Sequence, residues 1–258
     1  MEAVDVLVKK LVAIWKIPFV RRNLWRVFLI VSFVGSLIKS FEIVPETYFS
    51  NSKNFLNVYF VKVSWAWHLF LLLPFIALSN SYNRHWNFVL QRLSSQLVST
   101  AIWCMFTGLF IYVEDLTGVC YEPHSTQVLH GEFSSKVECQ KAGFRWNGYD
   151  VSGHSFILSY STLVIAEELV PMVSLKEDAF SQVHTSIILD VLYVALNAIV
   201  AVWIWMFGCT SLYFHDMAQK LLGTAFGLVG WYITYHVWYL KPFSPGLPPQ
   251  RRPRKLRA

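Results

Sequence analysis

A polar segment changes into a long apolar run within Trp146-Asn-Gly-Tyr-Asp-Val-Ser-Gly-His-Ser-Phe156. Three side chains that could carry out chemistry, Asp150, Ser152 and His154, lie at this border beside two glycines. The apolar run continues to about Val173, which is close to the roughly 20 residues that an α-helix needs to cross a hydrocarbon core. The stretch therefore predicts a histidine at the water-facing end of a membrane helix.

The composition of the whole chain agrees with a membrane protein. Hydrophobic residues make up 55% of the 258 residues and charged residues only 15%. Such a balance disfavours a soluble domain and favours several membrane helices. Besides the run that starts near Gly153, apolar segments of similar length lie at about 27–44, 58–78, 97–113, 184–207 and 221–238. The sequence thus predicts an all-α membrane protein with six transmembrane helices.

Basic residues indicate how these helices are oriented. The net charge is +6, and most of the excess lies near the two ends of the chain, which suits anionic lipid headgroups better than nucleic acid. Six spans place both ends on one side, and the positive-inside rule makes that side cytosolic. Three regions follow: a cytosolic amphipathic segment, a membrane domain and a basic, proline-rich cytosolic tail, at 1–26, 27–240 and 241–258. The non-cytosolic loops are then expected at about 45–57, 114–152 and 208–220.

The two terminal segments carry their own predictions. Apolar residues recur at helical spacing before Pro18, which favours an amphipathic helix at the membrane interface over a flexible tail. The stretch from Pro242 to Pro249 is expected to be extended and solvated, because its prolines prevent regular structure.

Two cysteines fall in the long non-cytosolic loop. Cys120 and Cys139 are candidates for a disulfide if that loop faces an oxidising compartment, and free thiols are the alternative.

Two histidines are expected at the same depth on the same face. His154 begins the fourth span at its non-cytosolic end, and His215 lies in the loop between the fifth and sixth spans. One neutral imidazole could attack phosphorus while the other, protonated, supplies a proton to the leaving oxygen. The alternative is that both are interfacial histidines bonded to the backbone. No spacing suggests a zinc site, and neither a metal nor another cofactor is expected.

Neighbouring polar residues have less specific roles. Asp150 or Ser152 could cap the fourth helix or support the histidines. Glu167 lies thirteen residues beyond His154, roughly 20 Å along a helix, so it is excluded from the same site. In the sixth span, Gly223 and Gly227 form a small-xxx-small pattern that is typical of close helix packing.

Five segments of the chain, at residues 56–67, 72–78, 148–156, 213–215 and 243–250, carry a resemblance to a known family. Through them nearly the whole chain resembles the fat storage-inducing transmembrane protein family. It implies a six-span protein of the endoplasmic reticulum membrane that supports lipid droplet formation and lipid homeostasis. Diacylglycerol and triacylglycerol are implied as lipid partners.

This family is similar to lipid phosphate phosphatases, and the similarity implies a fatty acyl-CoA diphosphatase with a bundle of that type. Such an enzyme cleaves acyl-CoA to acyl 4′-phosphopantetheine and adenosine 3′,5′-bisphosphate on the lumenal side. The resemblance makes His154 the proton donor and His215 the nucleophile.

The chain departs from the phosphatase pattern at several positions. Val151 replaces the proline before Ser-Gly-His, and Gln219 replaces the aspartate four residues after the second histidine. The phosphate-binding arginine and lysine also have no counterpart, and Lys136, Lys141 and Arg145 are the basic residues of the loop that could substitute. The alternative function is therefore a non-enzymatic protein that binds diacylglycerol and triacylglycerol and partitions them into droplets.

Overall fold

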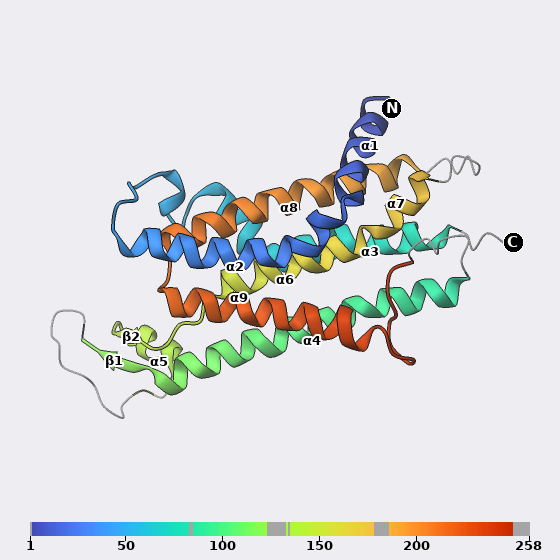
Figure 1. Ribbon diagram of the computed structural model, residues 1–258. Helices are drawn as coiled ribbons and strands as arrows, with labels where there is room; N and C mark the ends of the chain where they lie inside the picture. The colour runs from blue at the N-terminus through green and yellow to red at the C-terminus, as the bar shows by residue number, and fades with distance from the viewer. Residues whose placement is uncertain (1, 83–84, 123–132, 134, 178–185, 250–258) are drawn as a thin grey trace, which may run out of the picture.

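The computed structural model describes residues 2–82, 85–122, 133, 135–177 and 186–249. Long helices lie roughly along a common axis, with α1 and α7 at one end of the bundle and β1, β2 and α5 at the other (Figure 1). The α-helices are α1 (Glu2–Lys16), α2 (Pro18–Ser40), α3 (Ser64–Ser81), α4 (Trp86–Thr117), α5 (Lys136–Lys141), α6 (Gly153–Glu168), α7 (Val170–Glu177), α8 (Ile187–Tyr213) and α9 (Met217–Tyr232). The other elements are the 3₁₀-helix η1 (Tyr48–Ser50), the π-helices η2 (Asn57–Val61) and η3 (Ile233–Trp238), and the strands β1 (Val119–Tyr121) and β2 (Arg145–Asn147).

Four helical segments of the described chain are long and apolar enough to cross a membrane. They are Pro18–Ser40, Trp86–Thr117, Gly153–Lys176 and Ile187–Tyr213. Helix α3 is 18 residues long but carries polar residues near both ends, and α9 has only 16 residues before η3 begins. The chain is thus a mainly helical, multi-pass membrane protein, and spans through α3 and α9 stay predictions.

Several helix boundaries differ from those expected. Helix α2 starts at Pro18 rather than near residue 27, because proline at the first helical position has the required φ and lacks only an amide that would be unpaired there. The segment expected at 58–78 is divided between η2 and α3, with non-helical dihedrals at Val63. Helices α6 and α7 are separated at Leu169, just before Pro171, which cannot donate a backbone hydrogen bond.

Helix α6 forms the centre of the bundle. Nearly all its residues are buried, and α9, α8, α3 and α2 pack around it. Gly223 and Gly227 of α9 lie against the start of α6, where an added Cβ would collide with the carbonyl oxygens of Ser152 and Phe156. The small-xxx-small pattern therefore brings the first turn of α6 against α9.

Helix α1 is amphipathic and packs on the bundle. It buries Val8 and Val12, while Val6 and Ile14 stay exposed. Lys176 of α7 makes ion pairs with Asp5 of α1 at 3.3 Å and with Asp190 of α8 at 3.0 Å. These contacts fix the helix to the α7 end of the bundle.

A small covalently linked unit lies at the opposite end. Strands β1 and β2 pair in antiparallel fashion, with Cys120 opposite Trp146. A disulfide joins Cys120 to Cys139 of α5, and the Trp146 indole N–H donates to the Glu114 carbonyl at the end of α4. The disulfide and this hydrogen bond together hold the unit on α4.

The prediction that residues 242–249 are solvated was wrong for their middle part. Ser244 is buried, and its carbonyl accepts a 2.8 Å hydrogen bond from the Gln91 side chain of α4. Arg92, also of α4, donates to the Pro245 carbonyl at 3.1 Å and to the Gly246 carbonyl. An extended proline-rich segment has no internal hydrogen bonds, so its carbonyls are available to buried donors. Residues 250–258 lie outside the described part.

Candidate functional site

His154 and His215 line one cavity of about 190 Å³. His154 is in the first turn of α6, and His215 lies in the short link between α8 and α9. Other lining residues come from the region around η2 and from the end of α8, namely Ser52, Asn57, Lys62, Thr210 and Phe214. Segments far apart in the sequence thus meet at the end of the bundle that also carries β1, β2 and α5 (Figure 1), and most of the residues that line the small cavity there are of polar type.

The His154 ring is oriented by a buried asparagine. Its Nε2 lies 3.1 Å from Asn57 Oδ1, and because an amide oxygen only accepts, Nε2 carries the proton in this contact. Asn57 is itself fixed: its amide group donates to the Ser52 carbonyl at 2.6 Å, and its backbone N–H donates to Asn54 Oδ1 at 2.8 Å. The π-helix η2 therefore presents Asn57 Oδ1 to the histidine as an acceptor whose position is fixed by hydrogen bonds.

His215 has an unusual backbone conformation. Its φ is +49°, in the left-handed region that non-glycine residues seldom adopt. The Lys39 ammonium of α2 donates a 2.5 Å hydrogen bond to the His215 carbonyl. On the ring, Nδ1 lies 3.7 Å from Asp150 Oδ2, so a proton on Nδ1 would face the carboxylate and leave Nε2 with its lone pair.

Asp150 and Ser152 divide the roles that the sequence left open. Ser152 caps α6, because its Oγ accepts the Ser155 backbone N–H at 3.3 Å. Asp150 faces His215 instead.

Gln219 does not line the cavity but supports it. Its carbonyl accepts the Ser152 backbone N–H at 3.2 Å, and its side-chain oxygen accepts the Asp216 backbone N–H at 3.0 Å. In this way it ties the start of α6 to the start of α9. Close by, the fully buried Lys220 donates to the Ser211 carbonyl near the end of α8 at 2.6 Å. A cation at a helix C-terminus is favourable, and this one fixes the α8–α9 link that carries His215.

The lysine that lines the cavity is not one of the loop residues that the sequence suggested. None of Lys136, Lys141 and Arg145 lines it, and Lys136 pairs with Glu114 at 2.7 Å. Lys62 lines it instead, from the end of η2. The sequence signal for Lys62 was a charge inside an apolar segment. Such a charge is costly to bury in a membrane, so it usually marks a functional position.

The arrangement suits reactions of a phosphate ester or anhydride. It offers one imidazole with a free Nε2, a second imidazole that can exchange protons, and an ammonium that can neutralise an anionic oxygen.

The family described as "FIT: Fat storage-inducing transmembrane protein" matches residues 45–188 and 174–235. The chain belongs to this family. A relative of this FIT-family chain from Danio rerio, named acyl-coenzyme A diphosphatase FITM2, is 57% identical over 244 residues, which cover 95% of each chain. The Homo sapiens protein of the same name is 48% identical, over 84% of this chain and 82% of its own. Fat storage-inducing transmembrane protein 1 of Homo sapiens is 32% identical over 88% of this chain and 77% of its own. No solved structure matches the chain.

Proposed function

We propose that this FIT-family chain is a fatty acyl-CoA diphosphatase. It would hydrolyse the phosphoanhydride of acyl-CoA to acyl 4′-phosphopantetheine and adenosine 3′,5′-bisphosphate. The observation that carries the proposal is the cavity in which His154 and His215 lie together with Lys62. The names of relatives that are about half identical over most of the chain supply the substrate.

The reaction proceeds in two steps, with His215 as nucleophile and His154 as general acid and base. Nε2 of His215 attacks one phosphorus, an N–P bond forms, and the bridging P–O bond breaks. Protonated His154 gives its proton to the leaving phosphate oxygen. Water, deprotonated by His154, then attacks the same phosphorus and releases His215.

The other cavity residues support these steps. Asp150 stabilises the proton on Nδ1 of His215 and so maintains the nucleophilic tautomer. Lys62 neutralises the phosphate oxygens, on which negative charge rises in the transition state.

The acyl chain could lie on an apolar surface of η2 and α3. A groove of about 460 Å³ is lined by Tyr59, Val63, Ala66, Trp67 and Phe70, from η2 and the start of α3. Lys62, which lines the histidine cavity, is adjacent to Val63 in the chain. A substrate with its phosphates at Lys62 could therefore extend its apolar end along this groove.

The membrane arrangement is part of the proposal. Spans through α3 and α9–η3 would complete a six-span, phosphatase-like bundle with both termini cytosolic and the histidine cavity in the lumen of the endoplasmic reticulum. The disulfide at the cavity end and the basic α1 at the other support this orientation. Epitope tags on both termini should bind antibody in cells whose plasma membrane alone is permeabilised. A tag that is protected at either end would refute the topology.

The activity is tested with the purified full-length chain in detergent and oleoyl-CoA as substrate. Release of adenosine 3′,5′-bisphosphate is measured by mass spectrometry. We expect His154→Ala and His215→Ala each to lower kcat by at least about a hundredfold, in line with the loss of an acid–base or nucleophilic group. His85→Ala, which removes an exposed histidine at the start of α4, is the matched control and should retain activity. Undiminished cleavage in either cavity variant would refute the two-histidine mechanism.

The second candidate, a neutral-lipid binder without catalysis, is favoured by the apolar groove of η2 and α3. It would lead diacylglycerol and triacylglycerol toward droplets. This alternative holds if the wild-type protein binds both lipids, cleaves no acyl-CoA, and the two histidine variants still bind.

A further inference from the structure

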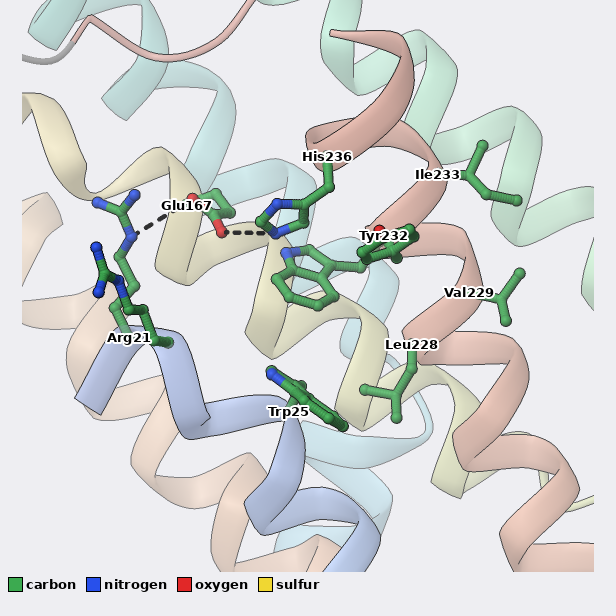
Figure 2. Close-up of a pocket in the computed structure, with 10 residues that line it drawn as sticks. Arg21, Trp25, Glu167, Leu228, Val229, Tyr232, Ile233 and His236 are labelled. Carbon is green, nitrogen blue, oxygen red and sulfur yellow. Dashed lines mark ion pairs between the residues drawn. The ribbon is translucent and has the colours of Figure 1, made fainter. Parts of the chain in front are cut away.

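A larger cavity, of about 710 Å³, lies at the opposite end of α6 from the histidines. Glu167 at its wall is thirteen residues beyond His154 and so roughly 20 Å along the helix. The cavity is formed between the start of α2, the end of α6, and α9 with η3. Figure 2 shows Trp25 and Leu228 on facing sides of it, with Glu167 between Arg21 and His236. Its volume is in the range of about 300–1,000 Å³ that is usual for sites that bind small molecules.

The charges at this cavity favour an anion. Arg21 Nε lies 3.6 Å from Glu167 Oε2, so the carboxylate that lines the cavity already has a cationic partner. His236 Nε2 lies 3.9 Å from Glu167 Oε1 and adds a positive charge only when its ring is protonated. Arg22 also lines the cavity, is exposed, and makes no ion pair within the part of the chain that the structure describes. Two guanidinium groups against one carboxylate leave a positive charge at the α2 side. Arginine is the residue best suited to bind a phosphate group in two-point geometry.

The wall formed by α9 and η3 is apolar, and its side chains are partly exposed on the outer surface of the bundle. Val229, Tyr232 and Ile233 line it while 45%, 55% and 52% of their respective surfaces stay exposed. These residues follow one another along α9 and η3, so they form a strip along the helix axis. In a membrane protein such a strip faces hydrocarbon chains. A cationic pocket at one end of an apolar strip matches the shape of an anionic amphiphile.

We propose that this cavity binds an anionic glycerophospholipid of the surrounding leaflet. Its phosphate would lie between Arg21 and Arg22, and one acyl chain would lie along Val229, Tyr232 and Ile233. The site is distinct from the histidine cavity in position and in its lining residues. A neutral diacylglycerol has the same chains but no phosphate, so it would gain nothing from Arg22.

The test compares two lipids with identical chains on the purified full-length protein. Dioleoyl phosphatidate and dioleoylglycerol are titrated in detergent, and bound lipid is measured by native mass spectrometry. We expect phosphatidate to bind about tenfold more tightly, as one charge-assisted hydrogen bond at a partly exposed site would give. Arg22→Gln should abolish this preference. Lys241→Gln, which removes an exposed cation just after η3 that does not line the cavity, should preserve it.

A second pair of variants tests the apolar wall. Val229→Trp fills the strip and should weaken binding of both lipids about tenfold or more, whereas Leu222→Trp, on the same helix but outside the cavity, should not. The four substituted positions, Arg22, Lys241, Val229 and Leu222, are exposed. A thermal melting curve is recorded for each variant to check that it folds. Equal affinity for the two lipids in the wild type would overturn the proposal. So would an Arg22→Gln variant that binds as Lys241→Gln does, or displacement of phosphatidate by equimolar oleoyl-CoA, which would make the cavity a substrate site.

Discussion

Replacing Arg92 with methionine is expected to destabilise the bundle severely. The Arg92 side chain is fully buried, and its guanidinium donates to both oxygens of Glu168 at 2.6 and 2.7 Å. It also binds the carbonyls of Pro245 and Gly246, while the Tyr235 hydroxyl donates to Glu168 at 2.5 Å. Methionine keeps an unbranched apolar stem and removes the guanidinium, so the loss is mainly that of the ion pair and its hydrogen bonds.

The magnitude follows from what is left behind. The variant keeps the Glu168 carboxylate in the interior with the Tyr235 hydroxyl as its remaining donor. Breaking a buried ion pair by removing one partner costs about 3–5 kcal/mol. With the scaling known for chains of this length, that loss corresponds to a fall in melting temperature of roughly 6–20 °C. Replacing both members by apolar residues should recover at least about 2 kcal/mol of the loss, because no buried charge then lacks a partner.

The assay is thermal unfolding of the purified protein in detergent for Arg92→Met, Glu168→Leu and the double variant. Arg145→Met, at an exposed position on β2, is the control. Two results would refute the reasoning. One is an Arg92→Met variant that melts within about 2 °C of the control. The other is a double variant whose loss equals the sum of the single losses, because partners of one buried pair cannot be independent.

Three further predictions concern the histidine cavity and the unit that lies at the same end. Asp150→Asn should lower kcat for oleoyl-CoA by about ten- to a hundredfold with little change in KM, because it weakens the hold on the His215 tautomer; an unchanged kcat would contradict this. Lys62→Met should lower kcat/KM by about a hundredfold, as removal of a transition-state donor does, and the assay is the same release of adenosine 3′,5′-bisphosphate. Cys120→Ser should cost about 3 kcal/mol by the loop-entropy estimate and lower the melting temperature, whereas an unchanged melting curve under non-reducing conditions would show that the disulfide adds no stability.

The helical regions were largely predictable from the sequence because apolar composition alone decides them. Four helices match apolar segments and are long enough to cross a membrane. The boundaries were less predictable. Proline acts in both directions, since it starts α2 at Pro18 and ends α6 before Pro171. A hydropathy pattern does not distinguish these effects, because they depend on where proline falls within the helix.

The pairing of the two histidines followed from counting spans, which gives depth along the membrane axis. The contacts around them could not be found in the same way. Asn57, Lys62 and Lys39 come from other segments of the chain. Only the packed structure shows that Asn57 and Lys62 line the cavity and that Lys39 bonds the His215 carbonyl. The docking of Ser244–Gly246 on Arg92 was missed for a related reason. A proline-rich segment looks solvated unless its buried partner is known.

The position of His215 has a consequence for how the protein is made. Its carbonyl is held by Lys39 of α2, while its cavity also needs Asn57, Lys62 and the start of α6. Lys39, Asn57 and Lys62 are synthesised in the first quarter of the chain, and His215 is synthesised in the last fifth. Their arrangement around the cavity can therefore form only late in synthesis. No truncated or partly inserted chain that lacks α8 and the following link can contain the assembled cavity. The proposed acyl-CoA diphosphatase is therefore expected to stay inactive during synthesis until its bundle is almost complete.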